Sequence, residues 1–153
     1  MSTRTLFLYP NHQGNYMLPP AIGILSSVLK KSNHIVDLFD TTQYTYFYTD
    51  KEKEVIEEQK KLKRINVDQS KSDRLMAKPF KKHKKMVEKH SNIYEDFRNK
   101  VLEFKPDLIA MSATEDLWMP GIKLLKTISD LDILTIAGGV FPTFAPDLAI
   151  SYD

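Results

Sequence analysis

The chain contains no cysteine. This absence excludes disulfides, thiolate metal sites, cysteine nucleophiles and an iron–sulfur cluster held within these 153 residues. Long apolar runs are also missing: no stretch approaches the roughly 18 residues that a membrane span needs, and the N-terminus has no signal-peptide core. The net charge of +2 is too small to argue for a nucleic-acid partner. We therefore expect a cytoplasmic protein that contacts no membrane.

What the sequence does contain is the pattern of a folded α/β domain. Hydrophobic residues make up 42% of the chain and charged residues 27%, which suits one domain with a buried core. Short apolar runs that end at proline, glycine or polar residues predict strands, and apolar residues at helical spacing predict helices between them. The expected strands are 5–9, 35–40, 107–111 and 133–137, and the expected helices are 20–31, 93–104, 117–129 and 144–150.

These alternating units predict a flavodoxin-like (Rossmann-like) three-layer α/β/α fold. Near-continuous apolar strands are typical of a parallel sheet that helices cover on both faces, here with the strand order 2-1-3-4. The chain stops where a fifth strand would follow, so we expect the last strand to lie outside it. On this interpretation residues 1–153 form a single domain, with its core in 4–40 and 91–150, at the N-terminal end of a longer enzyme.

Residues 41–90 interrupt this pattern with a polar segment rich in lysine and arginine. Glutamate and lysine recur at three- and four-residue spacings in 51–62, which predicts a solvated helix. A basic run follows at 81–85, but aromatic residues for base stacking are sparse beside it, which argues against nucleic acid. We expect a charged helical insertion after the second strand.

Small residues follow two of the expected strands. Ser112, Ala113 and Thr114 come directly after one, and Gly138 and Gly139 end the next. Paired glycines let a ligand lie directly against the backbone, because no Cβ intervenes. In an open parallel sheet, ligands bind outside the carboxyl ends of the strands, so both segments belong to the expected binding edge.

Several nucleotide-binding motifs are absent from that edge. The loop after the first strand lacks the GxGxxG fingerprint, and the chain has no GxxxxGK followed by serine or threonine. Met111 and Ser112 stand where a phosphoacceptor receiver domain has its aspartate. The threonine- and glycine-rich phosphate loop of flavodoxins is missing too.

The remaining pattern resembles the cobalamin-binding domain at the N-terminus of many radical S-adenosylmethionine enzymes. The matching segments are Leu6–Pro10, Pro19–Leu25, Asn33–Asp40, Pro106–Ser112 and Gly138–Thr143. The resemblance covers roughly residues 4–40 and 93–150, and leaves out the insertion.

The resemblance implies that the chain binds cobalamin in the His-off form, with the nucleotide tail inserted at the carboxyl edge of the sheet. The histidine-bearing DxHxxG loop of other cobalamin proteins is absent, so we interpret His12 as a loop histidine rather than a cobalt ligand. The resemblance also implies a downstream catalytic domain, outside this chain, that holds S-adenosylmethionine and the iron–sulfur cluster; no catalytic or metal-ligating residue is expected here. The implied cofactor-binding residues are Asn11, Ser112, Ala113, Thr114, Gly138, Gly139, Val140, Phe141, Pro142 and Thr143.

Other interpretations remain open. The paired glycines could form only a tight turn, and Ser112 and Thr114 could only cap the following helix. The chain could then be a non-catalytic scaffold with a degenerate site, whose basic insertion contacts protein or nucleic acid. Half of a nucleotide-sugar enzyme, with a diphosphate at the glycine turn, is a third alternative. For Trp118 we expect core packing.

Overall fold

The structure is a computed structural model that describes residues 2–12, 18–44 and 88–152. The central part of the expected insertion, residues 45–87, lies outside the described residues, so its helices stay a prediction. The described elements, in chain order, are β1 (Arg4–Tyr9), α1 (Pro20–Lys31), β2 (Ile35–Asp40), α3 (Ile93–Phe104), β3 (Leu108–Ser112), α4 (Glu115–Lys126), β4 (Leu134–Gly138), α5 (Val140–Phe144) and α6 (Pro146–Ile150).

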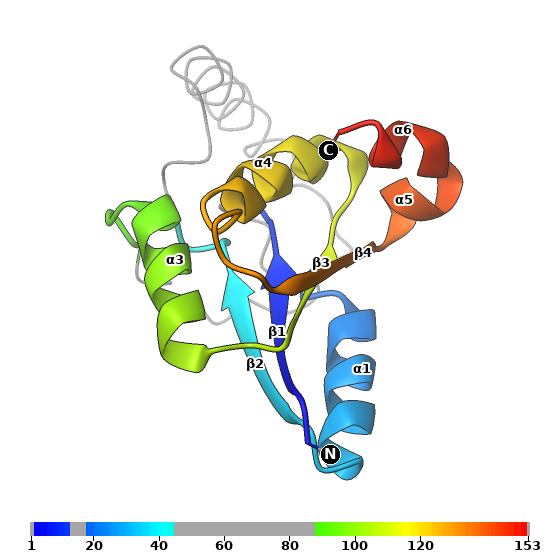
Figure 1. Ribbon diagram of the computed structural model, residues 1–153. Coiled ribbons are helices and arrows are strands. Elements are labelled where there is room, and N and C mark those ends of the chain that lie inside the picture. Colours follow the sequence, from blue (N-terminus) through cyan, green and yellow to red (C-terminus); the bar gives the residue numbers. More distant parts are fainter. Residues whose placement is uncertain (1, 13–17, 45–87, 153) are drawn as a thin grey trace, which may run out of the picture.

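The four described strands form one parallel sheet with the order β2-β1-β3-β4 (Figure 1). This confirms the α/β fold of flavodoxin-like or Rossmann-like type and the strand order expected from the sequence. Because every strand runs in the same direction, all four carboxyl ends meet at one edge of the sheet. The register pairs Tyr9 with Asp40 and Ser112 with Gly138.

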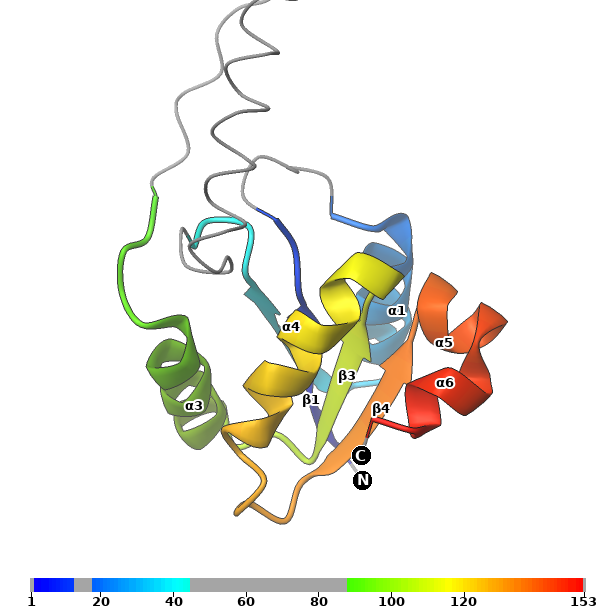
Figure 2. The same ribbon diagram turned by 90° about the horizontal axis from the view of Figure 1, so that it is seen from above.

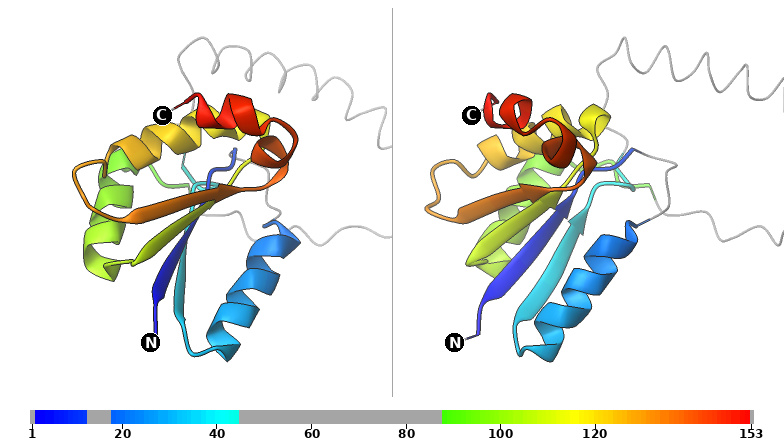
Figure 3. Two further views of the ribbon diagram at one scale, coloured as in Figure 1. Left: turned by 45° about the vertical axis from the view of Figure 1, so that its right-hand side comes forward. Right: turned by 90° about the vertical axis from the view of Figure 1, so that its right-hand side faces the viewer.

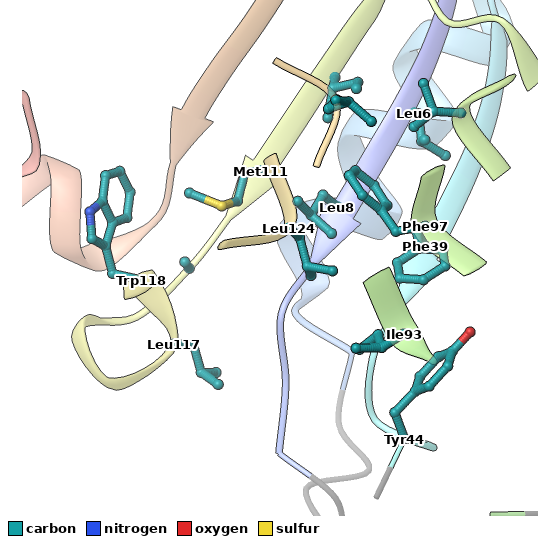
Figure 4. Packing of buried hydrophobic residues seen from close by; sticks show 14 of the residues in the cluster. Leu6, Leu8, Phe39, Tyr44, Ile93, Phe97, Met111, Leu117, Trp118 and Leu124 are labelled. Atoms are coloured by element: carbon teal, nitrogen blue, oxygen red, sulfur yellow. The ribbon is translucent and has the colours of Figure 1, made fainter. Parts of the chain in front are cut away.

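Helices α3 and α4 cover one face of this sheet, as the view from above shows (Figure 2). Leu6 and Leu8 of β1 are fully buried on that face and pair in register with Ile109 and Met111 of β3. They belong to one continuous hydrophobic cluster with residues of the two helices, including Phe97, which packs edge-on against the Phe39 ring at 5.0 Å between centroids (Figure 4). Alternation of side chains along β3 therefore turns Ser112 toward the opposite face.

The opposite face carries α1 beside β2 and β1 (Figure 3). Of the apolar stripe expected on this helix only Ile22 is buried, whereas Leu25 and Val28 are 51% and 55% exposed. The sequence also predicted a sheet covered on both faces, and this is wrong for β4, where every residue is exposed. The reason is position: β4 is the edge strand, two strands away from β1, and α1 packs mainly against β2.

Helix boundaries differ from the prediction at α4, which also ends early at Lys126 instead of residue 129, and in the segment that follows β4. Helix α4 begins at Glu115, two residues early, with Glu115 and Asp116 in its first turn, where carboxylates favour the positive end of the helix dipole. The single helix expected over 144–150 is instead two short ones, α5 and α6. They separate at Ala145 because the next residue, Pro146, disfavours helical backbone at the residue before it. Among the described helices, none is long and apolar enough to cross a membrane.

An ion pair joins β2 to α3 and gives stability a predictable dependence on pH. Lys100 Nζ lies 2.5 Å from Asp37 Oδ2, and both side chains are partly exposed. Burial alone would raise the pKa of Asp37, but the hydrogen bonds from Lys100 and from the Leu38 N–H, with the nearby positive charges, outweigh it and lower that pKa. The native pKa is therefore below the unfolded one, so the contribution is complete above the unfolded pKa and is lost as the pH falls through the native value.

We expect Asp37→Asn to cost less than about 1 kcal/mol at pH 7, because the pair is solvent-accessible and screened. The difference in unfolding free energy between this variant and the unchanged protein should shrink as the pH falls below about 4. Urea unfolding from pH 7 to pH 3 measures it. Lys100→Gln removes the other partner and should behave alike; a constant difference across this range would contradict the assignment.

Candidate functional site

The candidate site lies at the carboxyl edge of the sheet, where the tips of β3 and β4 are adjacent. Ser112 pairs with Gly138 in register, and the Ala113 N–H donates to the Gly138 carbonyl at 3.2 Å. The small residues that the sequence placed after two separate strands are thus brought together. The sequence predicted that these two segments lie at the same edge of the sheet, and the carboxyl ends of β3 and β4 are adjacent there.

The two glycines have different environments. A Cβ placed on Gly138 would meet no atom of the described residues within 4 Å, so the surface there is open. A Cβ on Gly139 would lie 2.8 Å from the Ala113 carbonyl oxygen, and this residue has φ of +105°, a conformation that favours glycine. Gly139 is therefore required by close packing of the turn on β3, whereas Gly138 leaves clearance for a ligand.

The three hydroxyl residues of the predicted site also differ. Thr114 occupies the N-cap position of α4, but its hydroxyl donates to Asp116 Oδ1 at 2.5 Å instead of capping the helix. The Thr143 hydroxyl donates to the carbonyl of Gly139, the N-cap residue of α5, at 2.7 Å. The hydroxyl of the half-buried Ser112 makes no hydrogen bond to any other described residue, and it lies beside Gly139. Of these three, Ser112 is the one whose hydroxyl can serve a ligand without losing a partner.

Asn11 contributes to the architecture of the edge. It is 2% exposed, its side-chain amide donates to the Thr42 hydroxyl at 2.8 Å, and its backbone N–H donates to the Thr41 hydroxyl at 2.7 Å. These bonds connect the loop after β1 to the loop after β2. The structure therefore places this predicted cofactor-binding residue in a buried polar network, facing β2 rather than the tips of β3 and β4.

The loop after β1 also contacts α4. His12 Nε2 lies 3.3 Å from Asp116 Oδ2, which gives this histidine a carboxylate neighbour and Asp116 a second partner besides Thr114. Burial, together with the charges of Asp40 and Asp116, raises the pKa of Tyr9, so its phenol stays protonated at neutral pH. No group of three or more histidine, aspartate or glutamate side chains in the described part of the chain could hold a metal ion.

The remaining predicted residues, which follow the glycines, differ in how far they are exposed. Val140 is 60% exposed, whereas Phe141 is buried in the core, where its ring lies 5.1 Å from that of Trp118 between centroids. Pro142 lines a cavity beside the same tryptophan. Trp118 itself is 4% exposed, which confirms the expectation of core packing.

Sequence reasoning missed the polar groups at the tip of β2. Thr41 and Thr42 are buried, and the hydroxyl and the backbone N–H of Thr42 both donate to Asp40 Oδ1. They could have been found by the rule that selected Ser112 and Thr114, because they too are hydroxyl residues directly after a strand. The contact between His12 and Asp116 joins residues more than a hundred positions apart, and no local signal reveals it.

Comparison with known proteins assigns no family to this site. No family model matches the chain, and neither the curated proteins nor the solved structures contain a match.

Proposed function

We propose that this chain binds cobalamin at the β3–β4 edge and presents it to a radical S-adenosylmethionine domain outside the chain. The observation that carries the proposal is the pairing of Ser112 with Gly138: a hydroxyl with no partner among the described residues lies next to a position with open space. The sequence resemblance supplies the identity of the ligand, and the structure supports a site of suitable character.

The groups at this edge fit the elongated nucleotide tail of cobalamin. Gly138 gives the tail access to the backbone, and the Ser112 hydroxyl can donate to or accept from it. Val140, exposed beside them, offers apolar contact. Alternation along the strands puts Ser112 and Gly138 on the face that α1 leaves uncovered at β4, so a ligand can approach from that side.

We expect cobalamin to bind in the His-off form, in which no protein side chain ligates the cobalt. His12 is the histidine nearest in sequence to the β1 tip, and its Nε2 lies against Asp116. When bound, cobalamin would supply methyl-transfer or electron-transfer chemistry at its cobalt. The residues of this chain would hold and orient the cofactor.

The proposal is tested by titrating the purified 153-residue chain with hydroxocobalamin and following visible absorbance, then recovering the complex by gel filtration. The unchanged protein should retain corrinoid. Gly138→Val, which fills the clearance, should weaken binding at least about tenfold, and Ser112→Ala about three- to tenfold. Ser129→Ala, an exposed serine hydroxyl at the far end of α4, is the matched control and should bind unchanged.

Failure of the unchanged chain to retain corrinoid would overturn the proposal. Equal corrinoid affinity in the two site variants and the control would show that the cofactor does not bind at the Ser112–Gly138 surface. Far-ultraviolet circular dichroism of each variant establishes that the fold is intact.

A further inference from the structure

The cavity beside Trp118, which is separate from the Ser112–Gly138 surface, lies on the other face of the sheet between α4, β4 and the short helices α5 and α6. Its volume is about 440 Å³, within the range of small-molecule sites. Apolar side chains such as Met111, Ile122 and Leu125 line it, with Ala149 and Tyr152 on the C-terminal side. None of the described residues that line it carries a charge.

Besides the hydroxyl-bearing residues Thr135 and Tyr152, the lining includes the polar N–H of Trp118. Its indole is buried, and Nε1 has no hydrogen-bond acceptor among the described residues. Figure 4 shows the indole nitrogen directed away from Leu117 and toward the pale orange ribbon that follows β4, the side on which the cavity lies. Buried N–H groups in proteins almost always have an acceptor, so the site calls for one from outside the described residues.

We propose that this cavity binds a small, neutral and largely apolar molecule that carries one hydrogen-bond acceptor, such as a ketone or ester carbonyl, for the Trp118 N–H. Neutrality follows from the uncharged lining, because a charged ligand would lose hydration without gaining an ion pair. The apolar part of the ligand would replace water against Ile122, Leu125 and Ala149. The carbonyl would satisfy the one buried donor and fix the orientation of the ligand.

The experiment uses camphor, a rigid ketone, as the probe, and exploits the fact that Trp118 is the only tryptophan. A ¹⁵N-labelled sample of the full chain therefore gives a single indole N–H resonance. Saturable binding of camphor should move its proton signal downfield, as expected when an N–H gains an acceptor. Cyclohexane, which has no acceptor, should enter the cavity without that downfield movement.

Two variants separate the hydrogen bond from the cavity. Trp118→Phe keeps an aromatic ring but removes the donor, and we expect camphor to bind about tenfold more weakly, measured by thermal shift. Ala149→Phe fills the cavity while retaining the reporter, and should abolish the camphor-dependent movement of the indole signal. Thr127→Ser, a conservative change beyond the end of α4, is the control and should leave binding unchanged.

Absence of a saturable indole shift at millimolar camphor would overturn the proposal. So would a shift that persists unchanged in Ala149→Phe. The hydroxocobalamin titration remains independent, because the lining of this cavity includes neither Ser112 nor Gly138.

Discussion

Replacing Phe97 with alanine is expected to lower the free energy of unfolding by about 3–5 kcal/mol, a large part of the stability of an ordinary domain. Phe97 has no exposed surface and sits on α3 at the centre of the core, where its ring meets Phe39 edge-on. Removing the ring loses its buried apolar area and leaves a cavity that the sheet cannot close without moving β2. Urea unfolding followed by circular dichroism gives the difference directly.

Leu102→Ala is the matched control for this change. It removes an apolar side chain from the same helix, but Leu102 is 47% exposed and should cost less than about 1 kcal/mol. If Phe97→Ala destabilises too much to yield a folded baseline, Phe97→Leu should show a smaller loss of about 1–2 kcal/mol. Comparable losses for Phe97→Ala and Leu102→Ala would show that α3 is not packed on the sheet as described.

Gly139→Ala should be nearly as damaging, with an expected loss of about 2–4 kcal/mol. Two causes act together: φ of +105° is costly for alanine, and the new Cβ would lie 2.8 Å from the backbone oxygen of Ala113. Because that oxygen belongs to the backbone, no side-chain rotation relieves the contact. The β3 and β4 tips would have to separate, so a variant that still folds should also lose affinity for hydroxocobalamin.

The neighbouring glycine supplies an unusually close control. Gly138→Ala introduces a methyl group that meets no described atom within 4 Å, and we expect a change within about 0.5 kcal/mol. Both variants replace a glycine with alanine, and the two positions are adjacent in the chain. If both were tolerated equally, the turn after β4 would have a different backbone conformation from the one described.

The sequence was sufficient for the fold because the signals that define it are local. Apolar runs such as 5–9 and 35–40 mark strands wherever they lie, and the alternation of strand and helix then leaves few topologies. The strand order is confirmed by the register of β1 with β2 and β3. Boundaries were less accurate, as at Ala145, where the conformational effect of Pro146 outweighs a continuous helical pattern.

Burial was harder to predict than secondary structure, because it depends on neighbours far away in the chain. Leu134 and Ile136 have the apolar character of core residues, yet they are 67% and 52% exposed. Whether such residues are covered depends on the elements packed around the strand, and the apolar pattern of the strand itself does not contain that information. The same holds for Asn11, whose hydrogen bonds reach Thr41 and Thr42 some thirty residues later.

The sequence predicted which residues lie at the candidate site, but not how their side chains are arranged there. The sequence selected Ser112 and Gly138, and the structure places them opposite each other. It could not distinguish the role of Gly138 from that of Gly139, because that difference arises from contact with Ala113 on another strand. Nor could it show that the hydroxyls of Thr114 and Thr143 donate to nearby residues in their own segments, Asp116 and Gly139.

The edge position of β4 has a consequence for self-association in concentrated solutions. An edge strand presents main-chain donors and acceptors along its outer side, and many proteins guard such an edge with lysine or proline. Leu134–Gly138 contains neither, and Val140 and Phe144, which follow it in the chain, are exposed as well. We therefore expect molecules in concentrated solution to associate through the edge of β4, and the small net charge to affect this association less.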